Sequence, residues 1–289
     1  MQFIDNSKIR LPKRKEGSHK GDNGSVLVVG GCEDYVGAVT LSGLAALRCG
    51  ADLVKIIAPE KVAWAINAYS PDIITKKISS KFFLPAHFGI VNSEIKKFDV
   101  LLIGNGIGLN KKTGEFCRKT IQRIEKFKVI DADAIKSISA DDAKNSIITP
   151  HLRELEQFLV NSATPGLIIK KIISEKNTAM KSSLLKKVIQ NFLNKNNIML
   201  LKGRIDIIIS KDEIFYNKTG NAGMTKGGTG DVLAGLCAGF LAQSKSLLQS
   251  AINAAYFNGM IGDVLLKNKM GFTYLASDMV GEIKRIIRL

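Results

Sequence analysis

Five glycines and one carboxylate stand together between residues 219 and 231, where a polar turn runs into an apolar helix. Glycine allows a positive φ and lets a ligand approach the main chain closely. The apolar run that starts at Val232 predicts a buried helix, whose free amides and positive dipole end would face the turn. We therefore expect the turn to bind an anion, and above all a phosphate. The glycines are Gly220, Gly223, Gly227, Gly228 and Gly230.

Asp231 stands at the start of that helix. A carboxylate in this place commonly caps the helix. Beside a phosphate-binding turn, however, it is better explained as a base that acts on a hydroxyl near the phosphate. Lys226, four residues before Gly230, would add a counter-charge.

The chain carries a strong basic excess, with 42 Lys and Arg against 26 Asp and Glu among 289 residues. The lysines are spread along the chain without aromatic residues between them, so they favour a solvated surface over a nucleic-acid interface. A basic surface would also help to collect a phosphorylated small molecule. A nucleic-acid-binding or non-catalytic nucleotide-binding protein is thus only a remote alternative.

Cysteine spacing and hydropathy bear on the compartment. The four cysteines form no CxxC pair, which argues against a zinc site or a disulfide framework and fits a reducing cytoplasm. The N-terminus lacks an apolar signal core, and no apolar run approaches the ~20 residues of a membrane span. We expect a cytoplasmic protein that does not enter a membrane.

Short apolar runs alternate with helical patterns along the chain. This alternation predicts an α/β fold in which helices cover both faces of a mostly parallel sheet, and the absence of a linker predicts one domain over residues 1–289. Residues 76–94 are expected to be irregular, and Trp64 to be a packing residue. The predicted strands are 25–29, 52–58, 73–75, 98–103, 128–131, 146–149 and 198–201, with an antiparallel hairpin at 205–210 and 213–216. The predicted helices are 38–49, 59–67, 111–127, 153–161, 181–194, 232–243, 247–266 and 275–287.

Several strands end in glycine or polar residues, as in the GNGIG segment at 104–108. The carboxyl ends of parallel strands meet at one edge of a sheet, where ligands of α/β proteins bind. Asp131 and Asp133 follow one strand, and either a helix cap or a functional role would explain them. A lone histidine is usually structural, but His151 gains interest from its place at a strand tip. We expect a crevice shaped by Gly30, Gly106, Asp131, His151, Lys202 and Gly230.

The chain contains, in this order, the segments HKGDNGSVLVVGG, GNGIG, VIDADAI, TPHLRE, LLKG and TKGGTGDVLAG. Together they resemble the NAD(P)H-hydrate dehydratase family of the ribokinase-like superfamily. The similarity runs from about His19 to the C-terminus, in the family's order of motifs. It implies a three-layer α/β/α ribokinase-like fold and an enzyme that restores NADH or NADPH from the S epimer of its hydrate, NADHX or NADPHX. ADP or ATP would phosphorylate the ring hydroxyl, and the phosphate would then leave.

The resemblance also implies roles for single residues. Asp231 would take the proton from the hydrate hydroxyl, and the amides of Gly228, Thr229 and Gly230 would stabilise the transferring phosphate. Ala38, Gly106 and His151, with Asp231, would hold the hydrate. Nucleotide contacts would come from Lys202, Gly203, Arg204, Ile205, Asp206 and Gly230.

Magnesium is expected as the cation that neutralises the phosphates, with no protein ligand assigned. By analogy with the family we expect a homo-oligomer, with a tetramer as one form. Many relatives carry an N-terminal epimerase domain that we do not expect here, so a separate epimerase would act upstream or the epimers would interconvert spontaneously. Two departures from the family pattern stand out: Leu152-Arg153 replaces the usual Pro-Gly after His151, and Asn105 stands where proline is common. A thiazole or pyrimidine alcohol kinase of the same superfamily is the alternative enzyme.

Overall fold

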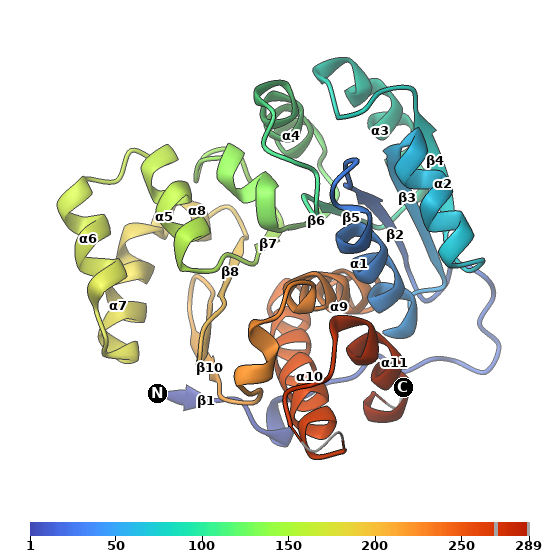
Figure 1. Ribbon diagram of the computed structural model, residues 1–289. Coiled ribbons are helices and arrows are strands. Elements are labelled where there is room, and N and C mark those ends of the chain that lie inside the picture. Colours follow the sequence, from blue (N-terminus) through green and yellow to red (C-terminus); the bar gives the residue numbers. More distant parts are fainter. Residues whose placement is uncertain (269–270, 288–289) are drawn as a thin grey trace.

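A computed structural model describes residues 1–268 and 271–287. Its centre is a ten-stranded sheet in the order β1-β10-β9-β8-β7-β6-β5-β2-β3-β4 (Figure 1). The strands from β8 through β7, β6, β5, β2 and β3 to β4 are parallel, whereas β9 is antiparallel to both β8 and β10. This arrangement confirms the predicted mostly parallel sheet. The strands are β1 (Gln2–Phe3), β2 (Ser25–Val29), β3 (Leu53–Pro59), β4 (Ile74–Ile78), β5 (Val100–Ile103), β6 (Phe127–Ile130), β7 (Ser146–Ile148), β8 (Ile198–Leu201), β9 (Asp206–Ile209) and β10 (Ile214–Asn217).

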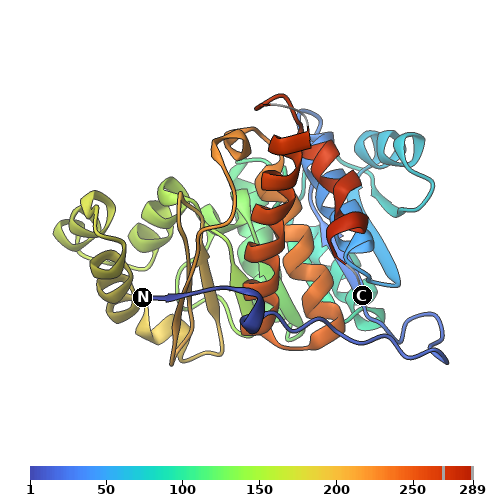
Figure 2. The same cartoon turned by 90° about the horizontal axis from the view of Figure 1, so that it is seen from below.

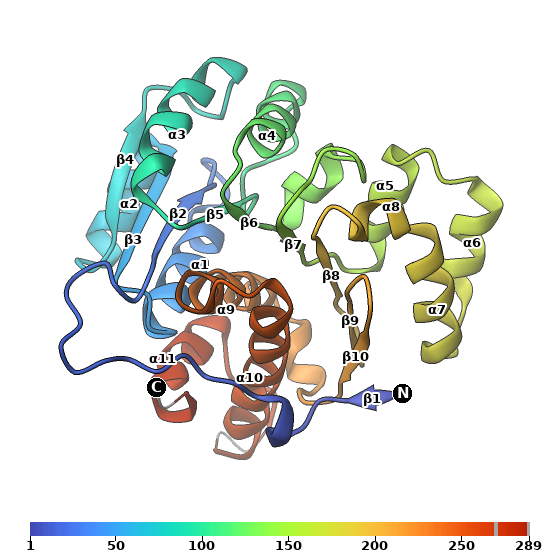
Figure 3. The same ribbon diagram turned by 180° about the vertical axis from the view of Figure 1, so that it is seen from behind.

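Helices cover both faces of the sheet (Figures 1 and 3). Alternate residues of the central strands enter two separate cores, as Val28 and Val29 of β2 illustrate, and this explains why these strands are apolar throughout. One core is closed by α1 (Val36–Arg48), α2 (Glu60–Tyr69), α9 (Thr229–Ser244), α10 (Leu247–Asn268) and α11 (Ala276–Ile286). The other is closed by α3 (Phe88–Glu94), α4 (Lys111–Arg123), α5 (Leu152–Asn161), α6 (Gly166–Ser174), α7 (Thr178–Val188) and α8 (Gln190–Leu193).

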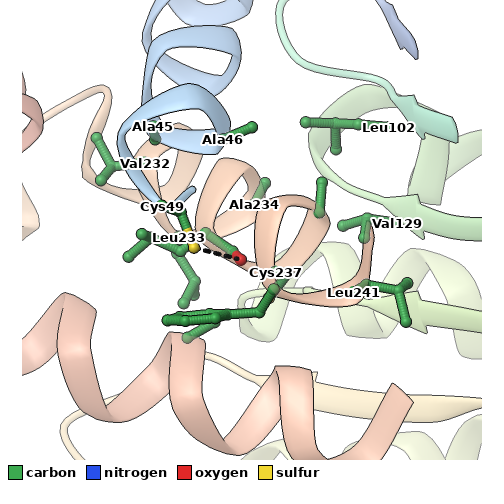
Figure 4. Close-up of a cluster of buried hydrophobic side chains, with 14 of the residues drawn as sticks. Ala45, Ala46, Cys49, Leu102, Val129, Val232, Leu233, Ala234, Cys237 and Leu241 are labelled. Carbon is green, nitrogen blue, oxygen red and sulfur yellow. Dashed lines mark hydrogen bonds between the residues drawn. The ribbon is translucent and has the colours of Figure 1, made fainter. Parts of the chain in front are cut away.

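Helices α1 and α9 pack closely because small residues face each other. A Cβ on Gly235 would lie 2.2 Å from the Ser42 carbonyl oxygen, and a Cβ on Gly239 would lie 2.9 Å from that of Ala46. From the first contact to the second, the position advances by four residues along each helix, so the two helices run parallel and in register. Figure 4 shows the neighbouring Ala45, Cys49 and Cys237 in this interface. Both helix N-termini consequently reach the same edge of the sheet.

The N-terminal segment crosses the molecule before β2 begins. β1 pairs with β10, and the chain then runs along α10 toward the opposite end of the sheet (Figure 2). Asn253 of α10 donates its amide to the Arg10 carbonyl at 2.8 Å, and Gln249 donates to the Lys8 carbonyl at 2.9 Å. Over the described residues, no helix combines the length and apolarity needed to cross a membrane.

Several local predictions were wrong. Residues 76–94 contain the end of β4 and helix α3, rather than irregular chain throughout. The helix predicted at 181–194 starts at Thr178 and breaks at Ile189 into α7 and α8. Helix α6 and the short β1 were not predicted, since neither has a long periodic pattern. Trp64 is 58% exposed, and Lys77 Nζ lies 4.0 Å from its ring centroid, so it is no core residue.

Candidate active site

The residues predicted to shape a crevice lie where the parallel strands end. The loops after β2 and β5 are joined there, because the Gly31 amide donates to the Asn105 carbonyl at 2.9 Å. A Cβ on Gly30 would lie only 2.4 Å from that same oxygen, which explains the need for glycine. Gly104 and Gly106 have φ values of +121° and +61°, so the loop after β5 uses the freedom of glycine to turn sharply.

The glycine-rich turn meets α9 as the sequence predicts. Gly228 has a φ of +95° and stands at the N-cap position, with no side-chain cap on the helix. The Thr229 hydroxyl donates back to the Met224 carbonyl at 2.7 Å, so this side chain braces the turn and does not supply a cap. The first amides of α9 are left for a ligand, and their dipole favours an anion.

The turn is fastened to the C-terminal part of the chain. Asp263 of α10 accepts from the Gly220 amide at 2.9 Å and from the Asn221 side chain at 3.0 Å. Lys226 Nζ donates to the carbonyls of Phe272 and Tyr274, the latter at 2.7 Å. The role of Lys226 as a counter-charge stays a prediction, whereas its role in bracing the turn is visible in these two hydrogen bonds. Its charge is directed at backbone carbonyls that hold the turn in place.

Asp231 enters the crevice from the first turn of α9. Its Oδ1 accepts from the Asn105 side-chain amide at 2.7 Å, and the same nitrogen donates to Asp131 Oδ2 at 2.9 Å. Burial and the nearby Asp131 carboxylate raise the pKa of Asp231 to about 6. A carboxylate with a pKa in this range can accept a proton near neutral pH, as a general base must.

Asp131 has a different environment, although it lies close by. It is 1% exposed and accepts from the Thr149 hydroxyl at 2.5 Å and from Lys202 Nζ at 3.0 Å. Its side chain makes no capping hydrogen bond to the turn that follows, so the cap interpretation fails for this residue. Asp133 instead accepts from the Gly108 amide at 3.1 Å and from Lys136 at 2.8 Å.

Lys202 and His151 meet at Glu154. Lys202 Nζ lies 3.7 Å from Glu154 Oε2, and His151 Nε2 lies 3.3 Å from Glu154 Oε1. Burial alone would lower the pKa of Lys202, but Asp131 and Glu154 outweigh it and raise the pKa. His151 caps α5, since its Nδ1 accepts from the Arg153 amide at 3.1 Å. Burial lowers the pKa of His151, so the imidazole is neutral at physiological pH.

The structure brings two of the residues expected to hold the hydrate, Ala38 and Gly106, next to each other. A Cβ on Gly106 would lie 3.0 Å from the Ala38 side chain, so these two residues touch. The parallel register of α1 and α9 places Ala38 level with Asp231, because Ser42 opposes Gly235 one turn further along. Gly230 also joins this group, since a Cβ on it would lie 3.4 Å from Lys202 Nζ.

A cavity of about 640 Å³ opens beside Lys202 along β8 and β9. Its lining includes four of the six residues expected to contact the nucleotide. Of the other two, Asp206 accepts from the Gly203 amide at 3.1 Å, and Gly230 lies next to Lys202. Burial raises the pKa of Asp206 to about 6. Five cations and no carboxylate line this cavity. The lining residues are Leu152, Lys176, Thr178, Lys181, Leu201, Lys202, Gly203, Arg204, Ile205, Ile207, Lys218 and Gly220.

Magnesium prefers oxygen ligands and is often held by one or two carboxylates together with substrate phosphates. Within residues 1–268 and 271–287, no group of three or more His, Cys, Asp or Glu side chains could hold a metal ion. Asp131 is already paired with Lys202. This donor set fits an ion that arrives with a nucleotide and does not fit a protein-built cage.

Sequence reasoning found Asp131, Asp231 and Lys202 but missed three residues that connect them. These are Asn105, Thr149 and Glu154, each within 3.7 Å of one or more of the three. Asn105 carried a signal, because it departs from the expected proline of its motif. Thr149 and Glu154 both lie in the matching segment TPHLRE, but only the pairing of β6, β7 and β8 shows that they meet Asp131 and Lys202.

The sequence matches a known family over most of its length. A family model described as NAD(P)H-hydrate dehydratase matches residues 26–285. The chain is 37% identical over 282 residues to a bifunctional NAD(P)H-hydrate repair enzyme Nnr of Methanocaldococcus jannaschii, a match covering 96% of this chain and 51% of that protein. It is 31% identical over 283 residues to an ADP-dependent (S)-NAD(P)H-hydrate dehydratase of Nitrosopumilus maritimus, covering 96% and 93%. The chain thus spans about half the length of the bifunctional relative.

Solved structures confirm the predicted ribokinase-like fold. A ribokinase-like superfamily protein of Enterococcus faecalis aligns with a TM-score of 0.80 at 25% identity, covering 98% of this chain and 94% of that one. An ADP/ATP-dependent NAD(P)H-hydrate dehydratase of Bacillus subtilis, co-crystallized with ATP/Mg2+, aligns with a TM-score of 0.76 at 22% identity, covering 99% of each chain.

Proposed function

The chain belongs to the NAD(P)H-hydrate dehydratase family, and from this premise we propose that it converts (6S)-NADHX or (6S)-NADPHX to NADH or NADPH at the expense of ADP or ATP. The observation that carries this proposal is the position of Asp231. Its carboxylate lies beside the uncapped amides at the start of α9, so a base and an anion site adjoin. This pairing suits phosphorylation of a hydroxyl group.

Asp231 would accept the hydroxyl proton as the hydrate oxygen attacks the terminal phosphorus of the nucleotide. The amides of Gly228, Thr229 and Gly230 would stabilise the charge on the transferring phosphoryl group. The second step breaks the ring carbon–oxygen bond, and inorganic phosphate leaves with that oxygen. Loss of a proton from the neighbouring ring carbon completes the double bond of the reduced nicotinamide. Hydroxide is a poor leaving group, and phosphorylation converts it into a good one.

Ala38, Gly106 and His151 are proposed to hold the hydrate. Ala38 lies in the first turn of α1, Gly106 in the loop after β5, and His151 at the N-cap of α5. His151 would do so as a neutral imidazole at the start of α5. The cationic cavity is proposed to take the nucleotide through Lys202, Gly203, Arg204, Ile205 and Asp206, with Gly230 next to Lys202. Magnesium, when bound, would neutralise phosphate charge there.

The wider setting is also proposed from the family. An epimerase would supply the S epimer, and residues 1–289 would act as one domain of a homo-oligomer, with a tetramer as one form. The name of the Nitrosopumilus maritimus relative specifies ADP. That name favours ADP as the phosphate donor here.

Recovery of absorbance in the reduced-nicotinamide band tests the proposal. Purified protein is mixed with S-NADHX or S-NADPHX and magnesium, with ADP, with ATP or with neither. A nucleotide-dependent rise is expected, and comparison of the four rates identifies both preferred substrates. Folded protein that binds nucleotide but gives no rise would overturn the proposal. In that case the thiazole and pyrimidine alcohols become the substrates to screen, with a phosphorylated alcohol as the product.

A further inference from the structure

The Asn105 side chain links the two carboxylates of the crevice. It is fully buried, and its amide nitrogen lies 2.7 Å from Asp231 Oδ1 and 2.9 Å from Asp131 Oδ2. An amide group has two N–H donors, so it can serve one carboxylate with each. The link joins the loop after β5, the end of β6 and the start of α9.

The orientation of this amide follows from the chemistry of its partners. Ionised carboxylates only accept hydrogen bonds, so the nitrogen of Asn105 must face them. The Asn105 Oδ1 atom is left buried and without a hydrogen-bond partner among the described residues. Leaving a buried acceptor unpaired is unfavourable, and such groups in native structures often mark a functional constraint.

Asp231 depends on this link more than Asp131 does. Asp131 also accepts from Thr149 and Lys202. In the part of the chain that the structure describes, Asn105 is the one side chain that donates a hydrogen bond to the Asp231 carboxylate. Asn105 is itself fixed, since its carbonyl accepts from Gly31 and its two neighbours are glycines with positive φ.

We propose that Asn105 is a positioning residue, which holds the Asp231 carboxylate in its ionised form and aims it at the hydroxyl of the substrate. This inference deepens the proposed function, and its catalytic part rests on that function. Asn105 does not itself touch the reacting atoms. It acts by offering one hydrogen to Asp231 and the other to Asp131, so that two neighbouring carboxylates are bridged by a shared donor.

The charged groups around Asp231 set the direction in which loss of the Asn105 amide would shift the pKa of Asp231. Burial raises the pKa of Asp231 most, and Asp131 and Asp133 raise it further, whereas Asn105 and Lys202 lower it. Removal of the Asn105 amide would leave the carboxylates facing each other without the bridge. We expect the pKa of Asp231 in Asn105→Ala to rise by about one unit, because a hydrogen bond to a charged group is worth about that much.

Carbon-13 NMR titration of labelled aspartate carboxyls is the direct test, with the Asp231 signal assigned by its loss in Asp231→Asn. An upward shift of the midpoint in Asn105→Ala is expected, and an unchanged midpoint would overturn the proposal. Asn105→Asp, which has nearly the same shape, serves as a second variant if alanine impairs folding. It adds a carboxyl group to the site, so an upward shift is again expected. Asn110→Ala, which removes an exposed helix cap on α4, is the control and should leave the midpoint unchanged.

The pH dependence of kcat tests the catalytic part separately. The acid limb of the kcat profile should move upward in Asn105→Ala with the NMR midpoint, while KM for the nucleotide stays unchanged. If the midpoint moves and the limb does not, Asn105 has a structural role only, and the proposal is wrong. The NMR titration needs no turnover. A protein that lacks dehydratase activity would therefore refute the proposed function while the bridge between the carboxylates is still tested.

Discussion

The two sides of the crevice are built in different ways. Around Asp231, backbone and side chains are closely packed, and Gly228, Gly106 and Gly30 each stand where a Cβ would come within 3.0 Å of a neighbouring atom. Around the cavity along β8 and β9, the polar lining consists mainly of long cationic side chains, of which Lys176, Arg204 and Lys218 are exposed. One side offers fixed geometry, and the other offers charge.

This difference matches two separate tasks. Transfer of a phosphoryl group depends on the positions of base and amides to within a fraction of an ångström, which a braced backbone can provide. Holding a nucleotide depends on the sum of several attractions, none of which has to be exact in geometry. We therefore expect substitutions on the braced side to change kcat or stability, and substitutions on the cationic side to change nucleotide affinity.

Asp231→Asn should produce the largest effect. The variant keeps the shape of the side chain but removes the base, so kcat should fall by about 10²- to 10⁴-fold. Nucleotide affinity, measured by calorimetry, should change little. A kcat within roughly threefold of that of the unmodified protein, which is about the scatter of an assay, would show that Asp231 is not the base.

Gly235→Ala should break the register between α1 and α9. The new Cβ would lie 2.2 Å from the Ser42 carbonyl oxygen, and such overpacking costs about 1 to 3 kcal/mol of unfolding free energy. Chemical denaturation measures the loss, and turnover should fall with it because Ala38 and Asp231 lose their alignment. Gly281→Ala in α11 is the matched control, since nothing lies within 4 Å of its Cβ. The Gly281→Ala variant should gain about 0.5 to 1 kcal/mol of unfolding free energy. Equal effects of the two changes would contradict the packing argument.

The pH dependence of stability should reveal the buried carboxylate. The pKa of Asp231 is raised to about 6 in the folded protein from an ordinary value of 3.8. The folded state therefore binds more protons than the unfolded state between these values, and Asp231 makes the protein less stable as pH rises through this window. Asp231→Asn should raise the melting temperature at neutral pH, by a margin that shrinks as pH falls from about 6 toward 4. A margin that is independent of pH would show that the charge is not the cause.

Lys181→Ala should give the smallest effect. Lys181 lines the cationic cavity, so its loss should raise KM for the nucleotide a few-fold and leave kcat unchanged. Added salt should narrow the difference, because screening weakens such attractions. Lys187→Ala, on an exposed part of the same helix, is the control. A fall in kcat in Lys181→Ala alone would mean that this side of the crevice also takes part in chemistry.

The sequence predicted most of the sheet and the residues at its edge. Glycine turns, buried strands and the apolar helix after Asp231 each have a local signal, so their positions could be inferred one at a time. The bridge made by Asn105 could not be inferred in this way. Its partners Asp131 and Asp231 lie 26 and 126 positions further along the chain, and they meet Asn105 only once β5, β6 and α9 are packed. The same holds for Lys226, whose partners lie 46 and 48 positions away. Helix α6 was missed because two lysines interrupt its apolar pairs, although Pro165 before it marks a helix start.

The central claim is that the hydrate hydroxyl is phosphorylated before it leaves. Its most direct test is to carry out the reaction with S-NADHX labelled with a heavy oxygen isotope in that hydroxyl and to analyse the inorganic phosphate by mass spectrometry. The account predicts that the label leaves with phosphate, because the ring oxygen has become a phosphate oxygen. Recovery of the label in water, with unlabelled phosphate, would contradict it.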